Sequence, residues 1–444
     1  MKKILASLTF VLAAVWLASI APATILAQEA ASPSCQLPAF HAQADFDPQS
    51  AVWVAWPSSD FGAEYISSKL TAAQGVIVNL TQALAEHVTV KMVVSDNATQ
   101  KQVQKKLVSQ GVNMADVKFI TLTHTDPWTR DWGPIFVVDG QGNKKVVNFK
   151  WNAWGLPEYA DPNETQTQDD FAPAAAAEEG LGLINANIVS EGGNHVFNGK
   201  GTMMAVLSTD LQRNPGYNQS QIEDEFRRVL GVKNFVWLQR GVVDDNIPTE
   251  RSWPGPGGQP DAYAMGAEHI DEFARFAGPN TILLAEVTAQ EAAQDPIAAE
   301  NRIRLENNYQ ILKAARDQDG KKFTIIRVPA AETMSYQLDQ NDGLYQWVSS
   351  MTFDDGSSVP AWPAPVYDIA ATSYMNFVVT NGAVLVQQYW KSGLPSVIRQ
   401  KDSQALQIIG SAFPGRQVIG ISAYDLDINS GGIHCATQEE PATN

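Results

Sequence analysis

Hydrophobic and polar positions alternate along this chain in one recurring order: two short strands, an amphipathic helix and a closing strand. In the clearest copy, strands over His195–Phe197 and Thr202–Leu207 flank a turn rich in glycine. The next segment, Gln219–Leu230, places its apolar residues at helical spacing on one face, and Phe235–Leu238 is an apolar run of strand length. This spacing predicts a helix followed by a closing strand.

The same order recurs in other parts of the chain. We predict copies over 268–328 and 374–421, and a fourth copy over 118–189 that contains a long polar loop at Pro157–Asp170. The helix and strand pieces between Phe61 and Thr123 form a degenerate fifth copy. The pattern therefore predicts an α/β fold of repeated strand-strand-helix-strand units. An open mixed α/β sheet is the alternative that the pattern leaves open.

The first 27 residues have the pattern of a signal peptide. Two lysines precede an apolar run over 4–20, and Ala27 ends an Ile-Leu-Ala stretch that suits a signal peptidase. We therefore expect export to a periplasm or secretion from the cell, with an uncleaved N-terminal anchor as the alternative. No later segment of the sequence is apolar enough to span a bilayer, so we expect no integral membrane association after cleavage.

The chain is acidic, and this limits its partners. It has 31 lysines and arginines against 48 aspartates and glutamates, which gives a formal net charge of −17. Nucleic-acid binding depends on a basic surface, so this balance argues against nucleic acid as a partner. A small cationic molecule or a cationic peptide suits the charge better.

Chemistry-bearing residues gather in four segments, each at a strand end or beside a glycine turn. These segments are Trp128–Pro134, Glu191–Asn194, Glu268–Asp271 and Gly431–Cys435. Together they offer a thiol, an imidazole and several carboxylates, the set required for nucleophilic attack on a cationic carbon. His269 and Asp271 alone are a weak metal-ligand pattern, and we expect no metal. The sequence has no phosphate-binding glycine loop, and we expect no cofactor.

Cys35 and Cys435 are the only two cysteines of the chain. In an oxidising compartment they could form one disulfide between the two ends of the protein. A thiol that stays free in an exported protein is more often reactive than structural, which directs attention to Cys435.

Seven motifs follow one another in a fixed order between Ala51 and Pro441. They are Trp128–Pro134, Asn152–Gly155, Glu191–Asn194, Arg213–Pro215, His269–Asp271, Tyr374–Phe377 and Gly431–Gln438. In these motifs the chain resembles the agmatine deiminases and the bacterial, Porphyromonas-type peptidylarginine deiminases of the guanidine-modifying pentein superfamily. The resemblance implies a five-bladed pseudosymmetric α/β propeller. On this basis we expect residues 28–44 to be a linker and residues 45–444 a single pentein-fold catalytic domain.

The resemblance also implies a role for each residue that matches. Cys435 is the expected nucleophile, His269 the general acid and base, and Asp131 and Asp271 the carboxylates that grip a guanidinium. A guanidinium is planar and resonance-stabilised, so attack on its carbon needs both orientation and charge, which paired carboxylates supply. Attack by the thiolate would release ammonia and leave a covalent thiouronium. Water would then hydrolyse this intermediate with the help of His269.

Four further residues are expected to bind the substrate. Trp128 is expected to pack on its methylene chain, and Asn376 to form a hydrogen bond with its polar end. Glu191 is expected to face the guanidinium or a distal amine. Trp154 belongs to a motif that is typical of the agmatine branch, and we expect it at the substrate as well.

Two neighbours of these residues allow an alternative interpretation. Arg130 is expected to brace the adjacent carboxylate of Asp131 through an ion pair. His434 is a rival general base, but adjacent residues on a strand point to opposite faces, so His434 would diverge from Cys435. We therefore favour His269.

The choice of substrate depends on what holds the end remote from the guanidinium. The peptidylarginine branch places arginines near Asn152–Gly155 to hold a terminal carboxylate, but this chain has no arginine between Val147 and Leu211. Agmatine lacks that carboxylate and also suits the acidic charge. We therefore predict an exported agmatine deiminase that gives N-carbamoylputrescine and ammonia.

Two departures from the agmatine branch keep alternatives open. Met265–Glu268 replaces an acidic-Thr-Asn run before the catalytic histidine, and agmatine breakdown is usually cytoplasmic. A peptidylarginine or free arginine deiminase that gives citrulline is therefore the main alternative. A thiol-dependent amide hydrolase, an amidinotransferase and a non-catalytic polyamine-binding protein are further ones.

Overall fold

The computed structural model describes residues 40–58, 67–255 and 262–443. The chain divides into two units, Met1–Gln36 and Leu37–Asn444, and the second contains every described residue. The predicted signal peptide and Cys35 lie outside the described residues. Within the described part, no helix has the length and apolar character needed to cross a membrane.

Five of the six sheets in the described residues share one construction. In the unit predicted most clearly, β8 (Val196–Phe197) pairs antiparallel with β9 (Thr202–Val206), and β10 (Asn234–Leu238) pairs parallel with β9. The helix α7 (Gln219–Leu230) connects β9 to β10 and buries its apolar face. Its first turn is closed by a reciprocal capping box, and a left-handed glycine ends it. The predicted unit is therefore confirmed.

Three other sheets repeat this order. Their strands and connecting helices are β5 (Ile135–Val138), β6 (Lys144–Lys150), α5 (Phe171–Glu178) and β7 (Gly182–Val189); β12 (Ala274–Gly278), β13 (Thr281–Glu286), α9 (Pro296–Ala314) and β14 (Thr324–Pro329); β17 (Val378–Val379), β18 (Ala383–Gln388), α11 (Ser396–Ala412) and β19 (Gln417–Ser422). In each sheet the first strand is antiparallel and the last is parallel to the central strand.

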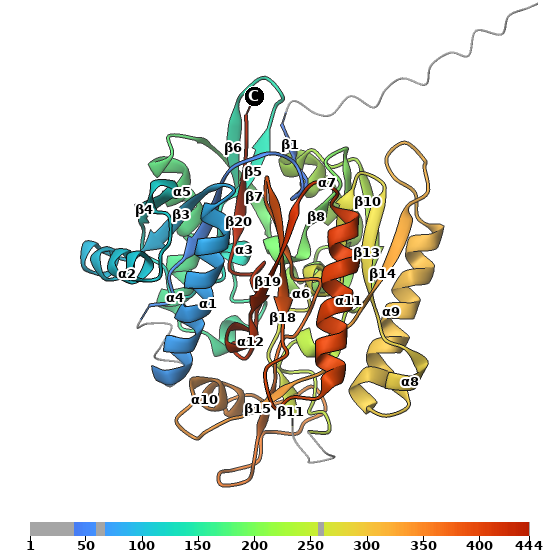
Figure 1. Cartoon of the computed structure of the whole chain (residues 1–444). Helices are drawn as coiled ribbons and strands as arrows, with labels where there is room; N and C mark the ends of the chain where they lie inside the picture. Colours follow the sequence, from blue (N-terminus) through green and yellow to red (C-terminus); the bar gives the residue numbers. More distant parts are fainter. Residues whose placement is uncertain (1–39, 59–66, 256–261, 444) are drawn as a thin grey trace, which may run out of the picture. The chain divides into compact units, whose positions relative to one another are not determined.

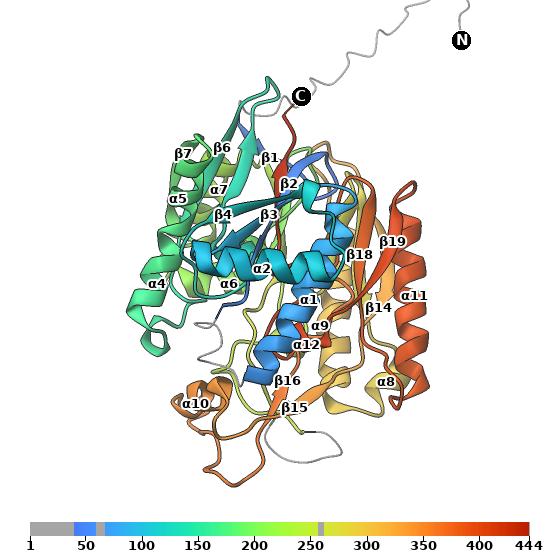
Figure 2. The same cartoon turned by 60° about the vertical axis from the view of Figure 1, so that its left-hand side comes forward.

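The fifth sheet joins the two ends of the described chain (Figures 1 and 2). Its N-terminal part contains β2 (Gln49–Ala55), α1 (Ser67–Ala85), β3 (Thr89–Val94), α2 (Asn97–Ser109) and β4 (Val117–Thr121). The antiparallel strand is β20 (Gln438–Pro441), which comes from the C-terminal end and pairs with β2. Trp53 Nε1 donates to Glu440 Oε2 at 2.9 Å across 387 positions of sequence. The predicted α/β fold of five repeated units is thus confirmed.

Three details of the sequence prediction need correction. Residues 118–121 form β4 of the fifth sheet and not the start of the fourth unit. The segment Pro157–Asp170 is not a loop, because it contains α4 (Pro162–Asp169), whose N-cap Asp161 and first-turn proline favour a helix start. The linker predicted over 28–44 ends too late, since β1 (His41–Ala42) pairs with β5.

A smaller, separate sheet is built from segments that precede β12 or lie between β14 and β17. It contains β11 (Ala262–Ala264), β16 (Tyr367–Ile369) and β15 (Ser335–Gln337), and the helix α10 (Gly343–Ser349) follows β15. Both views show this sheet and α10 on the opposite side of the domain from β1 (Figures 1 and 2). The other helices are the short α3 (Thr129–Trp132), α6 (Leu207–Arg213), α8 (Ala289–Ala292) and α12 (Tyr424–Asp427).

The fold places one short turn before the antiparallel strand of every unit. Helix α3 precedes β5, the 3-10 turn η4 (Gly192–Asn194) precedes β8, and η7 (Ile270–Glu272) precedes β12. Irregular turns that contain Asn376 and Cys435 precede β17 and β20. Five of the seven motifs that the sequence singled out therefore lie at equivalent positions of the five units.

Candidate active site

A cavity of about 330 Å³ opens between these turns. Its inner wall contains Asp131 from α3, His269 at the N-cap of η7, Asp271 within η7, and Cys435. These are the four residues predicted to carry the chemistry, and the fold brings them together from three of the five units. Their catalytic roles stay predictions.

Cys435 is a free and buried thiol. Asn376 Nδ2 donates to its Sγ at 3.1 Å, and the thiol faces Glu272 Oε1 at 3.7 Å and Asp271 Oδ2 at 3.9 Å. Burial, together with the charges of Asp271, Glu272 and Asp131, raises the pKa of Cys435 well above its ordinary value. The thiol therefore keeps its proton until a positive charge enters the cavity.

His269 lies between two carboxylates. Its Nδ1 is 3.5 Å from Asp131 Oδ1, and its Nε2 is 3.3 Å from Glu191 Oε2. The backbone N–H of His269 donates to Asp245 Oδ2 at 2.6 Å. Burial alone would lower the pKa of His269, but the charges of Asp131, Glu191 and Asp245 raise it to about 9. The imidazole is therefore protonated at neutral pH and suited to act first as an acid.

Gly193, the second residue of η4, lies very close to two side chains of the site. A Cβ atom at this position would lie 2.3 Å from His269 Nδ1 and 2.9 Å from Asp131 Oδ1. The backbone N–H of Gly193 also donates to Asp131 Oδ1 at 3.3 Å. Only a residue without a side chain lets η4 approach both groups this closely.

The two predicted guanidinium ligands differ in what holds them. Trp154 Nε1 donates to Asp131 Oδ2 at 2.9 Å, and burial raises the pKa of Asp131 although the charge of His269 opposes this. Burial would also raise the pKa of Asp271, but a hydrogen bond from His434 and its charge hold it below the ordinary value. Among the described residues, none donates to the buried Oδ1 of Asp271, although this residue lines the cavity. An unsatisfied buried carboxylate oxygen is a ready acceptor for an N–H group of a ligand.

The structure divides the four residues predicted to bind substrate into two pairs. Trp128 and Trp154 line the cavity, and their contacts with a substrate stay predictions. The prediction is wrong for Glu191, which is buried behind His269 and pairs with Arg213 Nε at 2.9 Å. Burial would raise the pKa of Glu191, but Arg213 and His269 lower it to about 2. This carboxylate therefore supports the imidazole and does not reach the cavity.

Asn376 is the second residue whose predicted role is wrong. It is fully buried beneath Cys435, and its Nδ2 donates to Glu272 Oε1 at 2.7 Å as well as to Sγ. Its Oδ1 accepts the backbone N–H of His434 at 2.7 Å. Asn376 therefore positions the turn of the nucleophile and cannot reach the far end of a substrate.

Two neighbouring residues also depart from expectation. Arg130 does not brace Asp131, because its Nη2 pairs with Glu439 Oε2 at 2.5 Å. His434 lies in a turn and not on a strand, so the strand argument against it was wrong. Its side chain nevertheless does not line the cavity. Its Nδ1 instead contacts Asp271 Oδ2 at 2.7 Å from behind the cavity wall.

Sequence reasoning missed several residues of the cavity. Glu272 follows the predicted Asp271 directly, and that adjacency was the available signal. Burial, followed by the charges of Asp271 and Asp245, raises the pKa of Glu272 well above its ordinary value. The outer part of the cavity, here called the rim, consists of residues from three other connections: Tyr159, Asp161, Glu164, Leu344, Trp347 and Ser430. No motif marked them.

Two groups of described side chains have the residue types of metal ligands, with ligand atoms within 4.8 Å of one another. The first is Asp271, Glu272 and Cys435, where the raised pKa of the thiol disfavours the thiolate that a metal requires. The second is Asp45, His434 and Glu439. Here Arg275 and Arg130 already pair with the two carboxylates. We assign no metal to either group.

The model of the Porphyromonas-type peptidyl-arginine deiminase family matches residues 41–441. The chain belongs to this family. It is 27% identical to an agmatine deiminase of Pseudomonas putida over 91% of this chain and 96% of that one. It is 25% identical to an agmatine deiminase of Medicago truncatula, with the same coverage. The predicted enzyme class, a hydrolase of the C–N bonds of guanidino groups, is thus confirmed for the family.

Solved structures agree with this family and its fold. An agmatine deiminase of Enterococcus faecalis has a TM-score of 0.71 at 23% identity and covers 91% of this chain and 97% of its own. A C. jejuni agmatine deiminase with substrate bound has a TM-score of 0.65 at 19% identity, covering 90% and 96%. The pentein fold of the family is therefore the fold of this chain.

Proposed function

We propose that this protein is an exported agmatine deiminase that hydrolyses the guanidinium of agmatine to N-carbamoylputrescine and ammonia. One observation carries the proposal: the buried Cys435 thiol faces the carboxylates of Asp271 and Glu272 in a cavity where the buried Oδ1 of Asp271 has no donor among the described residues. Such a site favours a ligand that carries a positive charge and several N–H donors. A guanidinium has both.

In the proposed complex, Asp131 and Asp271 accept the N–H groups of the guanidinium and fix its plane. The positive charge of the substrate then lowers the pKa of Cys435, so the thiol releases its proton to solvent and becomes a thiolate when the substrate is present. The surroundings of the thiol support this step, because the hydrogen-bond partners of Sγ in the described structure are two carboxylates and an amide. The substrate thus helps to activate the nucleophile that attacks it.

The proposed chemistry has two stages. The thiolate adds to the guanidinium carbon, the C–N bond to one terminal nitrogen breaks, and His269 protonates the departing ammonia. This leaves a thiouronium on Cys435 and a neutral His269. His269 then takes a proton from water, and the resulting hydroxide adds to the same carbon. The remaining hydroxyl proton passes to the sulfur as the S–C bond breaks, which releases the ureido product and restores the thiol. Because the pKa of His269 is raised to about 9, its imidazole carries the proton that the first stage requires.

The charge of the cavity favours an amine-bearing tail over a carboxylate-bearing one. The lining residues that the structure describes include no lysine or arginine. The rim has two carboxylates, Asp161 and Glu164, and aromatic side chains that a methylene chain can contact. A free carboxylate of arginine would find like charges there, whereas the amine of agmatine would find opposite ones.

Export is the second part of the proposal, supported by the signal-peptide pattern of residues 1–27. An exported enzyme meets agmatine or peptides outside the cytoplasm. The main alternative substrate, peptidyl- or free arginine, is therefore an explicit outcome of the test that follows.

Steady-state ammonia release from agmatine, free arginine and a peptide with C-terminal arginine tests the substrate. We expect kcat/KM for agmatine to exceed the other two by at least about 100-fold, because each carries an unpaired carboxylate into an acidic rim. A higher kcat/KM for arginine or the peptide would assign the protein to arginine deimination. Fractionation of cells that express the full chain tests export, and an unprocessed cytoplasmic protein would contradict it.

A further inference from the structure

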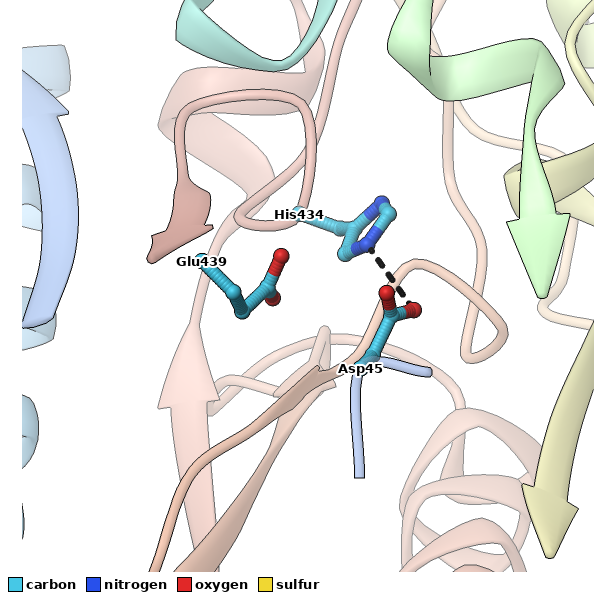
Figure 3. A group of neighbouring side chains, drawn as sticks. All are labelled: Asp45, His434 and Glu439. Atoms are coloured by element: carbon cyan, nitrogen blue, oxygen red, sulfur yellow. Dashed lines mark ion pairs between the residues drawn. The ribbon is translucent and has the colours of Figure 1, made fainter. Parts of the chain in front are cut away.

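Behind the active site, the segment between β1 and β2 contributes a carboxylate that no motif marked. Figure 3 shows Asp45 of this segment facing the imidazole of His434, with Glu439 beside them. The Nε2 of His434 lies 3.6 Å from Asp45 Oδ2. His434 itself is buried and does not line the cavity.

These groups form a chain of contacts that ends at the nucleophile. His434 Nδ1 lies 2.7 Å from Asp271 Oδ2, and the same oxygen lies 3.9 Å from Cys435 Sγ. The two ring nitrogens of His434 thus face two different carboxylates, one inside the active site and one in the N-terminal segment. The plane of the ring determines where Asp271 can place its other oxygen, Oδ1, which faces no donor in the described residues.

Asp45 is held firmly in its place. Arg275 Nη2 donates to Asp45 Oδ2 at 2.7 Å, and Gln49 Nε2 donates to the backbone carbonyl of Asp45 at 2.8 Å. Arg275 is itself buried and donates to the carbonyl of Phe377, in the unit that contains Asn376. The N-terminal segment is therefore tied to two other units of the fold at the level of the active site.

We propose that Asp45 is a positioning residue of the active site, acting through His434 to aim the carboxylate of Asp271 at the substrate. The N-terminal segment thus completes a site whose reacting groups all lie elsewhere in the chain. This proposal rests on the proposed guanidine hydrolysis. Without the carboxylate at position 45, the imidazole keeps its ion pair with Asp271 but loses the charge that faces its Nε2, so the ring can tilt and Asp271 moves with it. A displacement of about 1 Å at a substrate ligand costs up to about 100-fold in rate.

The variant Asp45→Asn removes the charge and keeps the size of the side chain. Asp47→Asn is the matched control, because Asp47 lies in the same segment and accepts the N–H of Ala44 at 3.0 Å, with no contact to His434 among its hydrogen bonds. We expect Asp45→Asn to lower kcat for agmatine about 10- to 100-fold and Asp47→Asn to change it less than about threefold. Asp45→Glu should recover part of the loss.

A second measurement reports the orientation of the Asp271 carboxylate and requires no turnover of substrate. Chloroacetamidine and iodoacetamide both alkylate Cys435, forming an S–C bond and releasing halide, but only the first carries a planar cation. The ratio of the two rates measures recognition of that cation, and we expect Asp45→Asn to lower this ratio about tenfold. A double-mutant cycle with His434→Gln should show that loss of Asp45 adds little once His434 is absent.

The outcomes separate the two proposals. A wild-type protein with no preference for the amidine and no turnover of any guanidine would refute the proposed function itself. A wild-type preference that Asp45→Asn retains in full, in a variant with unchanged Tm, would refute the role of Asp45 alone. Effects of Asp45→Asn and His434→Gln that add fully would also refute it, because Asp45 would then act independently of His434.

Discussion

The inner wall and the rim of the cavity differ in how the fold builds them. The inner wall comes from equivalent turns of the repeated units, and Asp131, Asp271 and Cys435 each lie within four residues of the antiparallel strand that follows. The rim comes from connections that do not repeat, such as η3 (Pro157–Tyr159), α10 and the turn that contains Ser430. The proposed reacting groups thus come from the repeated core of the fold, and we expect recognition of the substrate tail to depend on the connections that do not repeat.

The two regions also differ in rigidity. Inner-wall side chains are buried and held by ion pairs, as His269 is by Asp131 in the wall and by Glu191 behind it. Rim side chains such as Tyr159 and Trp347 are only half-buried, and a hydrogen bond from Trp347 Nε1 to the carbonyl of Tyr159 at 2.9 Å joins these two. Substitutions of the inner wall should therefore change kcat and pKa values, and substitutions of the rim should change KM.

Apart from removal of the nucleophile, the largest effect is expected for Asp131→Asn. One of the two carboxylates at the guanidinium is then neutral, and kcat/KM for agmatine should fall about 10²- to 10³-fold. The pKa of His269 should also fall below about 9, because a negative charge 3.5 Å from its Nδ1 is lost and the cationic form is less favoured.

An NMR titration of the imidazole signals measures the second effect. His195 is the internal control: it is also buried, and burial lowers its pKa to about 3 although the charge of Glu191 opposes this. A His269 pKa that stays near 9 in Asp131→Asn would show that Asp131 is not the charge that holds the proton.

Gly193→Ala should have the next largest effect. The new Cβ would lie 2.3 Å from His269 Nδ1, so the imidazole or η4 must move, and kcat should fall about 10²-fold. Gly75→Ala, in α1 with no atom within 4 Å of the new Cβ, is the matched control and should leave kcat unchanged. Equal activity of the two variants would mean that the close approach of η4 to His269 has no catalytic importance.

The smallest effect is expected at the rim. Trp347→Phe removes the hydrogen bond to Tyr159 and keeps an aromatic surface, so KM for agmatine should rise about three- to tenfold while kcat changes less than about twofold. Steady-state kinetics separates the two constants. A fall in kcat without a change in KM would place Trp347 in the chemistry and remove the distinction between rim and inner wall.

The sequence predicts the inner wall better than the rim for physical reasons. The unit from β8 to β10 was predictable because its strands and α7 are local, with clear periodicity. The pairing of β20 with β2 was not, since it joins distant segments that no turn connects. The motifs also located Glu191 and Asn376 correctly near the site, but a motif does not state which way a side chain faces.

The residues that were not predicted from the sequence have one thing in common: their place at the site depends on the folded structure. Glu272 adjoins a predicted residue, yet its role depends on burial that only the fold creates. Asp45 and Trp347 lie far in sequence from every motif and reach the site through tertiary packing. Export remains a prediction from the N-terminal pattern.

Ammonia release from agmatine by the purified wild-type protein, beside Cys435→Ala, tests the central claim most directly. The account predicts turnover by the wild type and a loss of roughly 10⁴-fold or more in the variant, because no other nucleophile replaces the thiolate. Comparable turnover by Cys435→Ala would contradict covalent hydrolysis at Cys435. No turnover by the folded wild-type protein would contradict the assignment of agmatine as its substrate.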